Sequence, residues 1–329
     1  MSEPKGRGVA WTEERGTSDE GRRRLKGAPE ASGETERVED TAGLVERSAA
    51  AYAAAVPDQP QDDGFFGPAS VTWRVASDLS APVAGLRSLL MQALHPLAMA
   101  GVDQHSDWRR DPVGRLAATS AYEAIVTFGD RASATRVAER VRAIHIRVQG
   151  VDTVTGQPYA AGDPALLLWV HAALVDSGLA AGRLFGTPLA DADADAYVRE
   201  MTIAAELLGV PHEIIPASEA ELERYFADVR PELRCTPAAA ESMSYLLDPP
   251  GLDSDIAELW QDIRDASIAT LPDWAIQEYG YPAPAPVTAE RRNEIRQALG
   301  VLDAVFLGEP GVLEARQRIA LRARSAGKA

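Results

Sequence analysis

Four of the chain's five histidines lie in one stretch that otherwise has the composition of buried helices: His95, His105, His145 and His171. A neutral imidazole is a strong ligand for iron at physiological pH, and its burial among apolar side chains is costly unless its ring nitrogens find partners. A metal centre is one such partner. The residue types therefore indicate a histidine-based site between His95 and His171.

Several other kinds of site are excluded because their motifs are missing. His212-Glu213 is not followed by the second histidine of a zinc helix, and no Glu-x-x-His pair of a di-iron carboxylate site occurs. The sequence has no GxGxxG motif, no P-loop, no GxSxG motif and no cysteine-histidine motif for covalent haem attachment. What remains is a histidine site that holds its cofactor without a covalent bond.

Two polar side chains at helical spacing could complete such a site. Arg115 and Thr119 lie four residues apart on a helix predicted to begin at Asp111-Pro112, so their side chains share one face. Arginine offers donors for a haem propionate or a bound oxygen species, and threonine offers a hydroxyl that can relay a proton. The same spacing also fits a surface arginine beside a threonine that bonds back to the helix backbone.

The two later histidines have structural alternatives of the same kind. His145 lies beside an apolar helical stripe that runs from Val137 to Val148, and Gly150 is predicted to end that helix. His171 lies in the apolar run LLLWVHAAL. Each ring is either a ligand or a hydrogen-bonded core residue.

The two earlier histidines lie where the pattern predicts a helix end or a loop. His95 precedes Pro96, which predicts a helix break or a kink of the kind often found beside cofactors, with plain packing as the alternative. Asp103 and His105 could contribute to an iron site of two histidines and one carboxylate, but the sequence assigns no third ligand.

The elements that must position these residues are helices. Ser80-Ala-Pro82, Asp111-Pro112 and Asp163-Pro164 each predict a helix start. Later helices are predicted at about 190–208, 217–229, 236–247, 254–270, 285–306 and 310–325. Strand signals are almost absent, so the sequence predicts a single all-α globular domain of roughly ten helices.

The domain organisation follows from composition. Residues 1–60 are predicted to be a disordered or weakly ordered tail, with a short alanine-rich helix near Val45 to Val56, and residues 61–329 are predicted to form the folded domain. The PAPAP run from Pro282 to Pro286 predicts a stiff surface connection within that domain.

Charge and hydropathy exclude several classes of partner. A net charge of -16 and a pI near 4.8 argue against nucleic acid and against electrostatic attachment to anionic lipid. The single cysteine, Cys235, and the absence of an apolar export signal predict a cytoplasmic protein. The most apolar window, Ala165 to Val175, is about half the length needed to cross a bilayer, so no membrane span is expected.

A family resemblance rests on several segments in order: FFGPASVTWRV, LLMQALHPLAMAGVDQHSDWRRDP, GRLAAT, HIRVQG, YAAGDPALLLWVHAALVDSGL and ELLGVP. Over about residues 64–325 the chain resembles the bacterial MpaB-type oxygenase family, which is related to the rubber-cleaving latex clearing protein. The resemblance implies an all-α fold with a globin-like core. It also implies a non-covalent haem b that uses O2 to oxidise or cleave an alkene in a hydrophobic isoprenoid chain.

The resemblance also assigns roles to residues. It matches Arg115 and Thr119 to the family's distal pair and His145 to the proximal haem ligand, while His171 falls in a family motif and is the alternative ligand. Ala118 stands where the latex clearing protein has a distal lysine. A methyl group can neither ligate iron nor act as a base, so the rubber-cleaving mechanism does not transfer directly.

The hypothesis from the sequence is a cytoplasmic haem-b oxygenase that acts with O2 on a small apolar substrate, with a redox partner not specified by the sequence. Arg115, Thr119, His145, His171 and His105 are its cofactor-binding candidates. A non-catalytic carrier of haem or a hydrophobic ligand is the alternative, and a peroxidase-like enzyme is a third.

Overall fold

The computed structural model describes residues 41–57, 61–249, 254–305 and 310–326, and the predicted tail up to residue 40 lies outside the described residues. The α-helices are α1 (Thr41–Ala55), α2 (Val71–Ala76), α3 (Ala81–Gln92), α4 (Pro96–His105), α5 (Pro112–Phe128), α6 (Arg131–His145), α7 (Pro164–Phe185), α8 (Asp191–Leu208), α9 (Glu219–Val229), α10 (Pro237–Leu247), α11 (Ser254–Thr270), α12 (Asp273–Glu278), α13 (Ala289–Val305) and α14 (Pro310–Ala326). Short 3₁₀ turns lie at η2 (His212–Ile214) and η3 (Arg230–Glu232), and the strands β1 (Gln149–Val151) and β2 (Pro158–Ala160) form one antiparallel hairpin.

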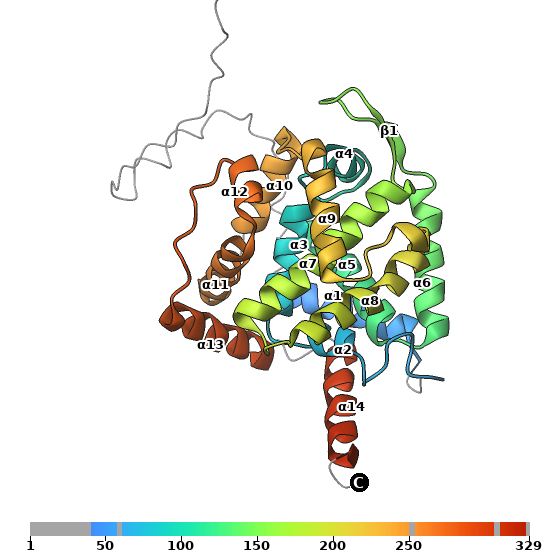
Figure 1. Cartoon of the computed structure of the whole chain (residues 1–329), viewed down its shortest axis with the longest axis vertical. Helices are drawn as coiled ribbons and strands as arrows, with labels where there is room; N and C mark the ends of the chain where they lie inside the picture. Colours follow the sequence, from blue (N-terminus) through green and yellow to red (C-terminus); the bar gives the residue numbers. More distant parts are fainter. Residues whose placement is uncertain (1–40, 58–60, 250–253, 306–309, 327–329) are drawn as a thin grey trace, which may run out of the picture. The chain divides into compact units, whose positions relative to one another are not determined.

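This architecture confirms the all-α fold that the sequence predicts (Figure 1). The later helices begin and end within a few residues of their predicted bounds, and Tyr281–Thr288 is an irregular connection as the PAPAP run predicts. The globin-like core implied by the resemblance stays a prediction.

Two of the three predicted helix starts are capped by the predicted side chain. Asp111 accepts from the Gly114 amide at 2.9 Å at the start of α5, and Asp163 accepts from the Ala165 amide at 2.9 Å at the start of α7. Each cap satisfies one of the amides that a helix start leaves without a partner. Ser80 precedes α3 but makes no cap bond, because its hydroxyl donates to Asp78 at 2.7 Å instead.

The long apolar helix α7 forms the centre of the core. One of its faces packs on α3 and α11 through residues such as Trp169 and Phe185, both with no exposed surface, and another packs on α2 and α8 through Val175 and Leu179. By length and composition α7 could cross a membrane, but 72% of its most apolar window is buried inside the structure. Burial on several sides explains why this helix is apolar nearly all round.

Arg87 joins three of the core helices. Its guanidinium, 3% exposed, donates to the Thr270 carbonyl at 2.8 Å and to the Ser177 hydroxyl at 2.7 Å, and it pairs with Asp176 at 2.7 Å. These partners belong to α11 and α7, while Arg87 belongs to α3. A buried charge is tolerated when it is paired and hydrogen-bonded in this way.

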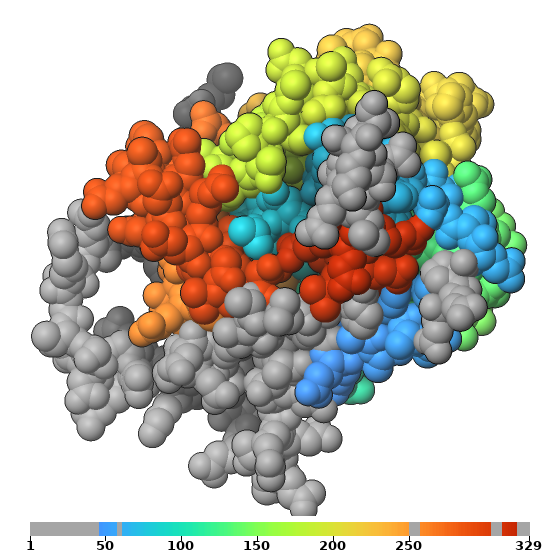
Figure 2. Space-filling view, turned by 90° about the horizontal axis from the view of Figure 1, so that it is seen from below, coloured from blue at the N-terminus to red at the C-terminus, as the bar shows by residue number. Residues whose placement is uncertain are grey.

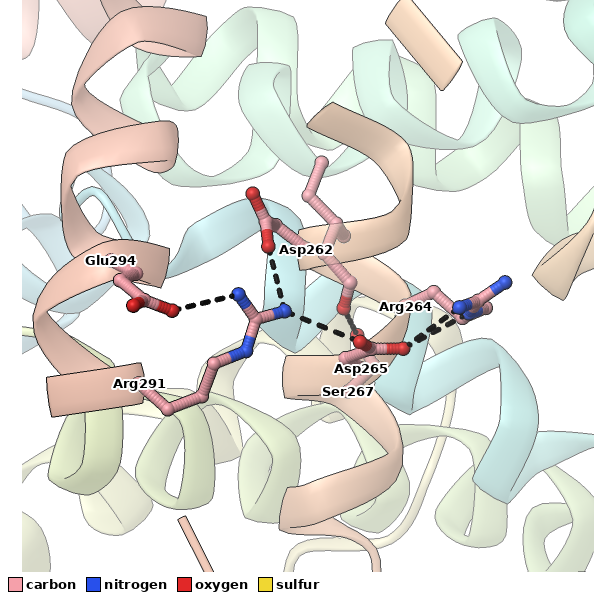
Figure 3. A network of polar contacts seen from close by, with 7 residues as sticks. Asp262, Arg264, Asp265, Ser267, Arg291 and Glu294 are labelled. Atoms are coloured by element: carbon pink, nitrogen blue, oxygen red, sulfur yellow. Dashed lines mark hydrogen bonds and ion pairs between the residues drawn. The ribbon is translucent and has the colours of Figure 1, made fainter. Parts of the chain in front are cut away.

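Two further contacts attach the C-terminal helices. Arg291 of α13 lies between Glu294 on its own helix and the carboxylates Asp262 and Asp265 of α11, at 2.7 Å from Asp262 (Figure 3). α14 packs on α1 and α5, with Ala315 in one apolar cluster with Tyr52 and Ile125, and Figure 2 shows α14 beside the first described helix. α1 (Thr41–Ala55), which includes most of the alanine-rich helix predicted within the tail, therefore packs on α5 and α14.

The predicted end of the α6 helix is wrong. α6 ends at His145 rather than near Gly150, and Ile144 of the expected apolar stripe is 44% exposed. Gly150 instead lies in β1 opposite Tyr159, where an added Cβ would come within 2.8 Å of the tyrosine hydroxyl. The glycine is needed for this close approach, and strands of three residues are too short to show a period of two.

Candidate functional site

The helical hairpin of α5 and α6 brings together three of the residues predicted from the sequence. Only Gly129 and Asp130 separate the two helices, and Asp130 caps α6 by accepting from the Ser133 amide at 2.7 Å. So short a connection makes the helices antiparallel, and they pack on each other. The first turns of α5, with Arg115 and Thr119, therefore lie at the same end of the hairpin as His145, the last residue of α6.

Arg115 and Thr119 are in contact. The Arg115 guanidinium donates to the Thr119 hydroxyl, and that hydroxyl also donates to the Arg115 carbonyl at 3.0 Å. The back-bonded threonine that the spacing left open is thus present, and its oxygen faces the guanidinium at the same time. Within the described part of the chain Arg115 pairs with no carboxylate, and the surrounding protein lowers the pKa of its guanidinium by desolvation.

His145 is held as a neutral imidazole. Burial, and after it the positive charge of Arg115, lower the pKa of the His145 ring below its ordinary value. Its Nδ1 is buried and has no hydrogen-bond partner among the residues that the structure describes. A buried nitrogen without a partner costs about 1–3 kcal/mol. Neutral imidazole is the form that binds metals, so a bound ligand would give the ring the partner that it lacks in the protein.

His171 is the other candidate ligand and is also neutral. It lies on α7 with 8% of its surface exposed, and burial lowers the pKa of its ring to about 4. Its ring makes no hydrogen bond with any described residue. Both rings thus keep the capacity to bind iron. What distinguishes His145 is its place beside Arg115, on the helix that packs against α5.

The other early histidines do not join this group. His105 is exposed and its ring meets the Tyr159 ring edge-on at 6.2 Å, while Asp103 pairs with Arg109 at 2.7 Å. No group of three or more His, Cys, Asp or Glu side chains that could hold a metal ion occurs in the described ranges. The iron site of two histidines and one carboxylate therefore has no support, whereas haem iron needs only one protein ligand.

His95 occupies the position before the first turn of α4, without a side-chain cap bond, and marks a helix break, the first of the two predicted outcomes. α3 ends at Gln92 and α4 begins at Pro96, so the proline occupies the first turn, where its missing amide costs nothing. The His95 ring is 4% exposed, lies 6.1 Å from the Trp169 ring and has Nε2 3.8 Å from a Glu232 carboxylate oxygen. Burial lowers the pKa of His95 although Glu232 opposes that shift.

Sequence reasoning missed Tyr122 on the same face of α5. Tyr122 lies three residues after Thr119 and seven after Arg115, a spacing that places all three side chains along one side of the helix. Its hydroxyl is buried without a hydrogen-bond partner in the described structure, and desolvation raises its pKa above the ordinary value of tyrosine. The i, i+4, i+7 spacing was the available signal. Tyr122 is therefore a protonated hydroxyl free to bond a ligand.

The site fits a haem-type cofactor in its donor set. Among the residues that the structure describes, it offers a neutral imidazole with an unpartnered nitrogen, an arginine without a carboxylate partner, and the hydroxyls of Thr119 and Tyr122. Ala118, on the same stretch of α5, adds only a methyl group. An imidazole suits iron, and a guanidinium suits the carboxylate groups of a haem.

The family model described as ER-bound oxygenase mpaB/B'/Rubber oxygenase, catalytic domain, matches residues 73–304. This range contains α4, α5, α6 and α7, and with them every candidate site residue. Searches of curated proteins and of solved structures gave no match.

Proposed function

The chain belongs to the mpaB/rubber oxygenase catalytic-domain family, and from this membership we propose that it is a haem-b-dependent oxygenase that acts with O2 on an apolar small molecule. Membership makes it an oxygenase domain and so an oxidoreductase. The haem, the alkene-containing isoprenoid type of substrate, the cytoplasmic location and a redox partner are parts of the proposal. The observation that carries it is the neutral, partly unpartnered His145 beside an arginine that pairs with no carboxylate in the described ranges.

Each residue of the candidate site has a role that follows from its chemistry. His145 would hold the iron, with His171 as the alternative ligand. Arg115 would bind a haem carboxylate through its fixed donors. Thr119, already held by Arg115, would hold or pass on a proton through its hydroxyl, and Tyr122 would donate a hydrogen bond because its raised pKa keeps it protonated. Haem supplies the redox chemistry with O2 when it is bound.

Ala118 bears on the choice between an oxygenase and a non-catalytic haem carrier. It provides no base on α5, so proton handling on this face falls to the hydroxyls of Thr119 and Tyr122. A protein that only carries haem needs no such group. Loss of the Thr119 hydroxyl should therefore slow turnover by an oxygenase but leave haem binding by a carrier unchanged.

The test is turnover by protein purified from haem-supplemented cells. We expect a haem absorbance spectrum, O2 uptake and new carbonyl or hydroxyl products from isoprenoid alkenes. Thr119→Val, which keeps the shape of the side chain, should retain haem and lose about 10²-fold in rate, the usual contribution of a positioned proton donor. A reduced, haem-loaded sample that stays unchanged under O2 with every alkene tried would favour the carrier. Turnover with H2O2 alone would favour a peroxidase.

A further inference from the structure

Exposed apolar side chains gather where α6 ends and the β1–β2 hairpin begins. Ile144 is 44% exposed, Ile146 74%, Val151 55% and Val154 51%. Single exposed apolar residues are normal, but these four β-branched ones all belong to one short segment of the chain. We call residues Arg140–Val154 the α6–hairpin surface.

The same segment carries arginines that the protein does not neutralise. Arg140, Arg142 and Arg147 are exposed, and their side chains make no ion pair or hydrogen bond with any residue that the structure describes. Other exposed arginines of this acid-rich chain bind carboxylates, as Arg109 and Arg183 do at 2.6 Å, although Arg199 and Arg234 have no ion pair among the described residues. The α6–hairpin surface is therefore locally basic in a protein whose net charge is -16.

The shape of the segment favours a flat partner over a peptide in a groove. Figure 1 shows the β1–β2 hairpin standing out from the helices at the end of α6. Val151 is the last residue of β1, and Val154 lies in the turn that follows, so both are carried on this projection. Apolar side chains on a projecting hairpin can insert into a deformable layer such as a lipid headgroup region. Long arginine side chains beside them can reach the charged groups at its surface.

We propose that the α6–hairpin surface docks on an anionic lipid bilayer. The valines and isoleucines enter the headgroup region, and the three arginines bind lipid phosphates. Net charge does not prevent this, because at physiological salt charges more than about 8 Å away are largely screened and the local arginines dominate. The proposal does not depend on the proposed function. It would nevertheless place His145, between Ile144 and Ile146, next to a bilayer in which apolar substrates dissolve.

The test is co-sedimentation of the full chain with vesicles. Vesicles of phosphatidylcholine with roughly one third phosphatidylglycerol should bind the protein, and pure phosphatidylcholine vesicles should bind it far less. Combining Arg140→Gln, Arg142→Gln and Arg147→Gln should weaken binding by about tenfold or more, and raised salt should do the same. Val151→Ser with Val154→Ser should weaken it further at equal charge.

Matched variants elsewhere control for general effects. Val301→Ser removes an exposed apolar side chain from α13, 51% exposed, and Arg224→Gln removes an exposed arginine from α9. Both should bind vesicles like the unaltered chain. Circular dichroism confirms that each variant is folded.

Two outcomes would overturn the proposal. The first is absence of binding to the anionic vesicles, or binding that the arginine and valine variants leave unchanged. The second is a dimer in analytical ultracentrifugation that the valine variant dissociates, which would make this surface a contact between two copies of the chain. Neither outcome touches the haem or turnover experiments.

Discussion

Arg87 and Arg115 both lie on helices, yet Arg87 is buried and fully partnered while Arg115 is exposed and has no carboxylate partner among the described residues. Arg87 bonds to Thr270, Ser177 and Asp176, whereas the Arg115 side chain bonds to Thr119 of its own helix and to no other side chain that the structure describes. Two tyrosines repeat the contrast: the Tyr279 hydroxyl donates to the Leu90 carbonyl at 2.6 Å, whereas the Tyr122 hydroxyl is buried without a hydrogen-bond partner in the described part of the chain. Arg87 and Tyr279, which the chain itself satisfies, hold the fold, whereas Arg115 and Tyr122 are available to a ligand.

The largest expected effect concerns the two arginines. Arg87→Met should lower the free energy of unfolding by about 3–5 kcal/mol, because it leaves the half-buried Asp176 carboxylate, the buried Ser177 hydroxyl and the Thr270 carbonyl without this partner. Arg115→Met should leave the stability of the haem-free chain unchanged or raise it, since no carboxylate loses a partner. Urea denaturation of both variants measures the difference. Equal destabilisation by the two substitutions would break the comparison.

The next effect is a pH dependence that His171 creates. Its pKa is about 4 in the folded chain and near 6.5 when unfolded, so the unfolded chain binds more protons between these values. The free energy of unfolding of the haem-free chain should therefore fall by about 3 kcal/mol as the pH drops from above 6.5 to 4. His171→Leu should remove most of this loss.

The exposed His212 provides the matched control for that pH series, because His212→Gln removes a histidine without opening the core. This variant should keep the pH dependence of the unaltered chain. A His171→Leu protein that still loses the full 3 kcal/mol of our prediction, about the same as the unaltered chain, would show that other groups cause it.

The smallest effect separates the two tyrosines. Tyr279→Phe should lower the free energy of unfolding by about 1 kcal/mol through loss of its bond to Leu90, and Tyr122→Phe should change it by less or raise it. Chemical denaturation of the haem-free variants resolves the two. If Tyr122→Phe costs as much as Tyr279→Phe, then Tyr122 has a structural partner and leaves the group of ligand-facing residues.

The sequence predicted the fold where local chemistry decides it. The caps at Asp111 and Asp163 and the long apolar run of α7 are visible as patterns, and the structure has them. The β1–β2 hairpin was missed because its close packing depends on Gly150 meeting Tyr159 across the turn, a contact between residues that no periodicity reveals.

The site was predictable in part for the same reason. A spacing of four residues is enough to place Arg115 with Thr119, and seven would have added Tyr122. His145 lies close to Arg115 because a short connection after α5 folds α6 back along it and the two helices have similar lengths. A prediction of this contact from the sequence needs all three features together. That buried nitrogens and hydroxyls have no partners is a property of the packed structure alone.

The most direct test of the account is a titration of the haem-free chain with hemin, followed by absorbance in the Soret region. We predict that the unaltered chain and His171→Ala bind one equivalent of hemin, and that His145→Ala binds none stoichiometrically. Full Soret absorbance in His145→Ala with loss in His171→Ala would move the iron ligand to α7. An unaltered chain that binds no hemin under any reconstitution would contradict the account.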